Sequence, residues 1–107
     1  MNHFENPESA ARIRRITEME NRLNRIGTAL KIAELCPDEL EAVREDVREL
    51  SAYFDGPLWR EDFEADEAGL LPQDLKRGVL SEDAIYDLLT EYDALKVQPQ
   101  KPAQKQE

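Results

Sequence analysis

Apolar residues recur at alternating steps of three and four along most of the first 55 residues, and this spacing constrains the fold more than any other feature. The positions are Ile16, Met19, Leu23, Ile26, Leu30 and Ala33, then Leu40, Val43, Val47, Leu50 and Phe54. Such steps form a heptad seam, which lies along one face of a helix, as in a coiled coil. Pro37 interrupts the seam because proline disfavours helix in the preceding residue. The sequence therefore predicts a long antiparallel helical hairpin, about 7–35 and 38–55.

The ends of these two helices carry recognisable signals. Asn6 can cap the first helix, with Pro7 at its first position. Asp38 followed by Glu41 resembles a capping box for the second helix. Gly56-Pro57 then stops the second helix.

The first helix is longer than the second, so part of its apolar face needs a cover. Its overhang is roughly 15 Å at about 1.5 Å per residue, and it carries Ile13, Ile16 and Met19. Either the C-terminal half folds back over these residues or a second subunit covers them. A homodimer through Ile13, Ile16 and Met19 is therefore one expectation.

The second half predicts two or three shorter helices packed on the hairpin. One carries Trp59 and Phe63 on a single face and ends near Gly69. The segment LKRGVLSED then joins two helices, with Gly78 predicted as a left-handed cap and Ser81 as the next N-cap.

The last helix has its own apolar stripe and its own start signal. Leu80 and Ile85 match a hydrophobic staple, and the stripe continues through the sequence to Leu95. We expect an all-α fold with one domain over 1–95 and a disordered polar tail over 96–107.

The excess of acidic residues limits the classes of partner that the protein can bind. The chain has 24 acidic and 14 basic side chains and a net charge of −10. An acidic surface repels nucleic-acid backbones and anionic membranes, whereas a basic protein is its complement. The N-terminus lacks the pattern of a signal peptide, and the single Cys36 cannot form an internal disulfide, which favours the cytoplasm.

One long block resembles a known family. WREDFEADEAGLLPQDLKRGVLSEDAIYDLL, residues 59–89, resembles the signature region of a small bacterial protein family catalogued only as a domain of unknown function. Residues 15–54 are similar in length and pattern to the rest of that family. The resemblance implies a short, mostly helical, cytoplasmic bacterial protein, and it brings no activity and no catalytic residues.

The densest cluster of acidic residues is a weak candidate for a metal-binding site. Its acids are Glu61, Asp62, Glu64, Asp66 and Glu67. Carboxylates suit Ca²⁺ or Mg²⁺, and Asp62, Glu64 and Asp66 match the first ligand positions of an EF-hand loop. The rest of that loop does not match, so a solvated acidic face is the simpler interpretation.

Other chemistries find little support, and we expect no enzyme and no cofactor. Cys36 and the single histidine, His3, would lie on the order of 40 Å apart on one continuous helix. Zinc would lack nitrogen and sulfur ligands. The glycines do not form a phosphate-binding loop.

The function predicted from the sequence is a non-catalytic protein-interaction module whose acidic residues 59–95 bind a partner protein, with a basic protein as their electrostatic complement. The candidate binding residues are Trp59, Asp62, Phe63, Asp66, Glu67 and Tyr86. Three alternatives stay open: an acidic decoy for the nucleic-acid groove of another protein, a protein dependent on a divalent cation, and a structural subunit of an assembly.

Overall fold

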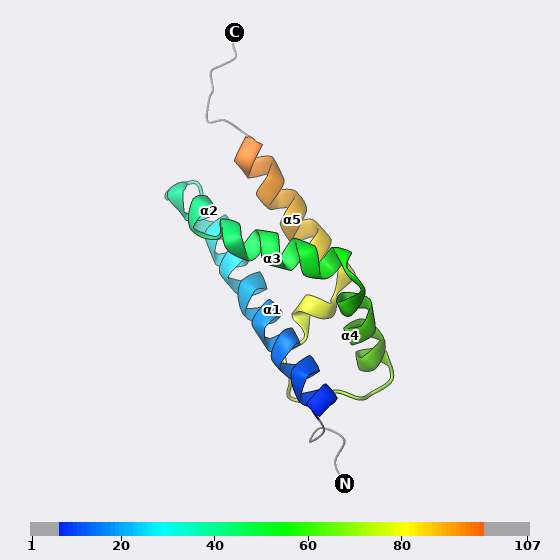
Figure 1. Cartoon of the computed structure of the whole chain (residues 1–107). Helices are drawn as coiled ribbons and strands as arrows, with labels where there is room; N and C mark the ends of the chain where they lie inside the picture. Colours follow the sequence, from blue (N-terminus) through cyan, green and yellow to red (C-terminus); the bar gives the residue numbers. More distant parts are fainter. Residues whose placement is uncertain (1–6, 98–107) are drawn as a thin grey trace.

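The computed structural model describes residues 7–97 and shows an all-α fold in which the first half of the chain forms a hairpin (Figure 1). The elements are α1 (Pro7–Ile32), α2 (Asp38–Ala42), α3 (Arg44–Asp55), α4 (Pro57–Glu67), the 3₁₀ helix η2 (Gly78–Leu80) and α5 (Glu82–Val97). The described part contains no strand. The predicted cap Asn6 and residues 98–107 of the predicted tail lie outside the described residues, whereas Lys96 and Val97, which were predicted to begin the tail, belong to α5.

The second arm of the hairpin is bent rather than continuous. A single helix over 38–55 was expected, but the chain leaves helical geometry at Val43, which separates α2 from α3. Valine has a lower helix propensity than its neighbours Ala42 and Arg44, so the bend falls where it costs least. The predicted capping box of Asp38 is also wrong, because Pro37 occupies the N-cap position and no side chain caps α2.

The C-terminal half of the same chain covers the overhang of α1. Figure 1 shows α4, η2 and α5 returning alongside α1 and α3. Ile16 is completely buried, while Ile13 and Met19 are half-buried. The uncovered apolar face that suggested a homodimer is therefore closed within one chain.

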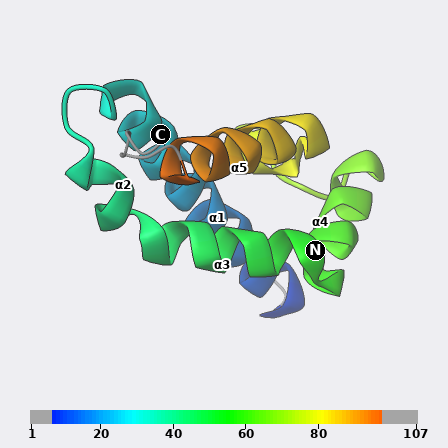
Figure 2. The same cartoon turned by 90° about the horizontal axis from the view of Figure 1, so that it is seen from above.

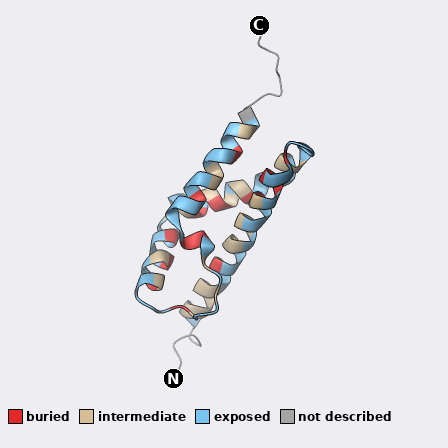
Figure 3. Cartoon of the chain, turned by 180° about the vertical axis from the view of Figure 1, so that it is seen from behind, coloured by how far each residue is buried: buried red, intermediate tan, exposed pale blue. Residues whose placement is uncertain are grey.

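The core runs along the inward sides of the helices. Figure 2 looks down on the bundle and shows α1, α3 and α5 on different sides of its centre, and Figure 3 shows the buried positions facing inward. The core includes Ile26, Leu50, Val79 and Ile85, each fully buried. Full burial of such an aliphatic side chain contributes about 1.5–3 kcal/mol. No helix among residues 7–97 is both long and apolar enough to cross a membrane.

Gly69 and Gly78 in the second half of the chain do not both have the roles at helix ends that the sequence predicted. Gly69 has φ +74° and ends α4 in the left-handed conformation that glycine tolerates best. Gly78, predicted as a left-handed cap, does not have positive φ and instead begins η2. The Ser81 prediction is confirmed, since its Oγ accepts the Ala84 N–H at 3.2 Å at the start of α5.

Candidate functional site

A fully buried carboxylate, Asp62, links α4 to the first turns of α1. Arg15 grips it with two bonds, Nε to Oδ2 at 2.8 Å and Nη2 to Oδ1 at 2.6 Å. Arg12 adds an Nε bond to Oδ1 at 3.1 Å, and the Tyr53 hydroxyl of α3 donates to Oδ2 at 2.7 Å. Asp62 thus ties three helices together through charge-assisted hydrogen bonds.

The electrostatics of this Asp62 cluster raise the pKa values of two of its members, Tyr53 and Arg15. Burial raises the pKa of the Tyr53 hydroxyl well above its ordinary 10.0, and its bond to the Asp62 carboxylate raises it further. The bond to Asp62 also raises the pKa of Arg15, against the opposing effect of burial. A buried charge is strongly destabilising unless paired, so the two arginines are what allows Asp62 to lie in the core.

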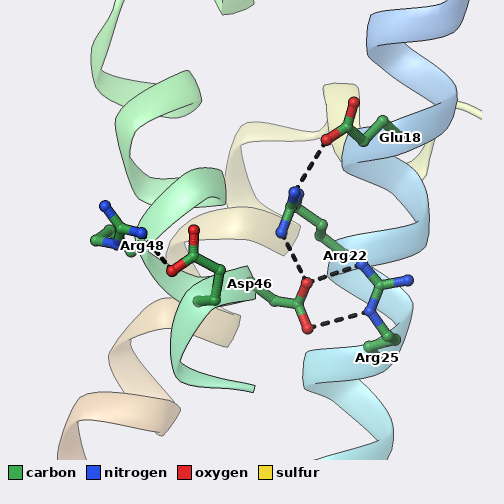
Figure 4. Close-up of polar contacts among 6 residues, drawn as sticks. Glu18, Arg22, Arg25, Asp46 and Arg48 are labelled. Atoms are coloured by element: carbon green, nitrogen blue, oxygen red, sulfur yellow. Dashed lines mark hydrogen bonds and ion pairs between the residues drawn. The ribbon is translucent and has the colours of Figure 1, made fainter. Parts of the chain in front are cut away.

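Asp46 of α3 forms a second cluster of the same kind nearer the surface. Arg25 donates from Nε to Oδ2 at 3.1 Å and from Nη2 to Oδ1 at 2.8 Å, and Arg22 donates from Nη1 to Oδ1 at 2.9 Å. Figure 4 shows both arginines reaching from α1 to Asp46, with Glu18 holding the other side of Arg22 at 3.0 Å. The bond from Arg25 is the main cause that lowers the pKa of Asp46 below its ordinary 3.8.

A third polar contact fixes the LKRGVLSED block. The Val79 N–H donates to Glu20 Oε1 of α1 at 2.8 Å, and the Val79 carbonyl accepts the Trp59 indole N–H of α4 at 3.0 Å. A side chain at Gly78 would place its Cβ 3.2 Å from Glu20 Oε2. Glycine there lets the carboxylate approach the chain, so this stretch of the block serves the fold.

Most of the predicted binding residues are engaged inside the molecule. Trp59, one of the candidate binding residues, is buried, with 5% of its surface exposed. Its ring stacks on the half-buried Phe63 with centroids 5.2 Å apart and meets Phe54 edge-on. Asp66 pairs with Arg77 at 3.1 Å. Trp59 is therefore a core residue and is not available as a partner anchor.

Asp62, which the predicted metal site requires, is not free to bind a metal ion. Both carboxylate oxygens of Asp62 accept hydrogen bonds from arginines or Tyr53, while Glu64 and Glu67 are exposed. Within the described range 7–97, no group of three or more His, Cys, Asp or Glu side chains is placed to hold a metal ion.

Of the six predicted binding residues, only Tyr86 lies on α5, on the exposed side of that helix. This side carries a row of exposed residues that we call the α5 outer face: Glu82, Asp83, Tyr86, Asp87, Glu91 and Asp93. Tyr86 is 63% exposed, the highest exposure among the aromatic residues described. The nearby cation Lys96 is placed over the Tyr92 ring, with its nitrogen 5.5 Å from the centroid. Among the aromatic residues predicted to bind a partner, Tyr86 is the one whose side chain is exposed.

The comparisons with known proteins give a family and nothing finer. The family model described as "Domain of unknown function (DUF4298)" matches residues 16–99. The chain belongs to this family. No curated protein and no solved structure matches this chain. The matched range covers both carboxylate clusters except Arg12 and Arg15, together with the whole α5 outer face.

Sequence reasoning missed the two clusters, although a signal was present. Asp46 lies three residues after Val43 and four before Leu50, next to the seam residue Val47, so it falls on the apolar side of the helix. Asp62 likewise lies three residues after Trp59. An acid at an apolar position of a helix requires a buried cation partner, and the arginine pairs of α1, three residues apart, supply it.

Proposed function

We propose that this protein is a non-catalytic interaction module of the cytoplasm, and that its α5 outer face binds a basic segment of a partner protein. The observation that carries the proposal is the accessible tyrosine set among five exposed acids on one helix. Tyrosine is enriched at interfaces because it buries a large surface with little loss of rotamer entropy.

The internal clusters strengthen this reading of the charge. Arg12, Arg15, Arg22 and Arg25 are directed at Asp62 and Asp46 within the fold. The strongest concentration of cations in the chain is thereby used for folding, and α5 keeps an acidic surface. A row of like charges accelerates the encounter with an oppositely charged partner, and an aromatic contact then slows dissociation.

Affinity capture with the tagged full-length protein tests the proposal. Lysate of the source cell is passed over the protein at about 0.1 M and about 0.5 M salt, since screening weakens exposed charge contacts. We expect a defined basic protein that is retained by the wild type and lost with Tyr86→Ser combined with Asp83→Asn and Asp87→Asn.

A matched variant controls for charge removed elsewhere. Glu34→Gln combined with Glu41→Gln and Glu64→Gln neutralises exposed acids outside α5, and it should retain the same partner. Loss of the partner with both sets would contradict an α5 interface. Retention at low salt of nucleic-acid-binding proteins alone, displaced by added DNA, would favour the decoy function instead.

A further inference from the structure

A hollow of about 370 Å³ lies where the corner between α3 and α4 meets the first turn of α5. Asp55 at the end of α3 and Glu82 at the start of α5 line it, with Arg60 on the α4 side and parts of Phe54 and Trp59 behind them. Figure 1 shows this corner beside the beginning of α5.

The charged groups of the hollow are not engaged by the rest of the described chain. The side chains of Asp55, Arg60 and Glu82 are exposed and make no hydrogen bond or ion pair within residues 7–97. This differs from Asp62 and Asp46, whose oxygens are used by arginines of α1. Two carboxylates and one guanidinium leave the hollow with an uncompensated negative charge.

Two exposed side chains with apolar surface, Leu58 and Tyr86, belong to the helices that form the hollow. Leu58 lies between the lining residues Pro57 and Trp59 and is 42% exposed. Tyr86 follows Glu82 by four residues, so it lies one turn further along the same face of α5. Arginine and tyrosine are enriched among the residues that dominate interface energies, so an acidic hollow on the same helices as these exposed side chains suits an arginine anchor.

We infer that this hollow receives an arginine side chain of the basic partner, with its guanidinium between the carboxylates of Asp55 and Glu82. The neighbouring apolar residues of the partner then contact Leu58 and Tyr86. A planar guanidinium suits two carboxylates better than an ammonium does, because its N–H donors form a fixed fork. This inference rests on the proposed function and specifies its partner as a segment with arginine between apolar residues.

The test is a titration of the full-length ¹⁵N-labelled protein, followed by NMR, with the capped peptide acetyl-Leu-Arg-Leu-amide. We expect saturable shifts centred on the amides of Gly56, Arg60, Glu82 and Tyr86, with a dissociation constant on the order of 1 mM. The same peptide with uncharged citrulline in place of arginine should cause little shift. Equal binding of the citrulline peptide would overturn the inference.

Two variants locate the binding. Asp55→Asn combined with Glu82→Gln should weaken the arginine peptide about tenfold, whereas Asp87→Asn combined with Glu91→Gln removes equal charge from α5 and should change the affinity less than about threefold. Arg60→Gln should tighten binding, because it removes a competing cation. Equal losses in the two double variants, or shifts of the same amides by inorganic phosphate, would overturn the inference.

The capture experiment separates this inference from the proposed function. If the partner remains bound to Asp55→Asn with Glu82→Gln but is lost on changing the other acids of α5, then the α5 interface stands and the arginine hollow is wrong. If no variant and no wild type captures a partner, while the peptide still titrates the hollow, then the hollow stands and the proposed function is wrong.

Discussion

The Asp62 and Asp46 clusters consist of the same residue types, one aspartate and two arginines, but differ in how deeply the aspartate is buried. In each, two arginines of α1 that are three residues apart grip one aspartate of a facing helix. The Asp62 side chain is completely inaccessible and its arginines are 18% and 22% exposed, whereas Asp46 is 11% exposed and its partner Arg25 is 53% exposed. Water can therefore replace the lost partners of Asp46 far more easily.

This difference assigns different roles to similar contacts. An exposed ion pair contributes about 0–1 kcal/mol, while breaking a buried pair costs about 3–5 kcal/mol because a charge is left uncompensated in the core. Asp62 therefore decides whether α4 stays attached to α1, and Asp46 adjusts the α1–α3 contact. Neither aspartate is available to a partner, which separates them from the acids of the α5 outer face.

The largest expected effect comes from Asp62→Asn. The substitution keeps the shape but leaves Arg12 and Arg15 without their negative partner, so the free energy of unfolding should fall by about 3 kcal/mol. Urea denaturation followed by circular dichroism measures the loss. Glu64→Gln, an exposed acid on the same helix, should leave stability unchanged. A loss below about 1 kcal/mol for Asp62→Asn would mean that the cluster is not what holds α4.

Removing the hydroxyl of Tyr53 should have an intermediate effect. Tyr53→Phe loses the 2.7 Å bond to Asp62, but Asp62 keeps its arginines, so we expect a loss of about 1.5 kcal/mol. Because the folded pKa of Tyr53 lies above its ordinary 10.0, its contribution is full below pH 10 and declines as pH rises further. The gap between wild type and Tyr53→Phe should therefore narrow in alkaline solution, and a gap that widens would contradict the cluster.

Asp46→Asn should be milder than either. Arg22 is only 17% exposed, but Arg25 is 53% exposed and retains access to water, so we expect a loss of about 1 kcal/mol in urea denaturation. The matched comparison is Asp62→Asn under identical conditions. If Asp46→Asn lowered the free energy of unfolding as much as Asp62→Asn does, burial would not explain the relative strength of the two clusters.

The smallest effects come from acid and salt. The folded pKa of Asp46 lies below its ordinary 3.8, so its contribution is full above that value and is lost as pH falls below it. The gap between wild type and Asp46→Asn should thus close below about pH 4. At about 1 M salt, where screening acts within roughly 3 Å, this gap should shrink while the Asp62→Asn gap persists. Equal salt responses in the two variants would contradict the account.

The sequence predicted what depends on neighbours along the chain. The hairpin follows from apolar residues three and four apart, and the start of α5 follows from Ser81, whose hydroxyl bonds three residues ahead. Two features of the hairpin were predicted wrongly: the capping box of Asp38, and the continuity of the second helix at Val43, which depends on how α2 and α3 pack.

The candidate site was less predictable because its contacts join residues distant in sequence. Asp62 is 47 and 50 residues from its two arginines, and Val79 is 59 residues from Glu20. In sequence, Asp62 is one of five clustered acids, and Gly78 after two cations resembles a helix end. Only the fold shows that Asp62 is buried and that Gly78 admits the carboxylate of Glu20. Tyr86 was predicted as one of six candidate binding residues, and the α5 interface itself stays a prediction.

The most direct test of the central claim, that partner binding belongs to the α5 outer face, is photo-crosslinking in the source cell. A photoreactive benzoylphenylalanine replaces Tyr86 in one strain and the exposed Asn21 of α1 in a matched strain. We predict one crosslinked protein from position 86 that is absent from position 21. No adduct from position 86, or the same adduct from both positions, would contradict the claim.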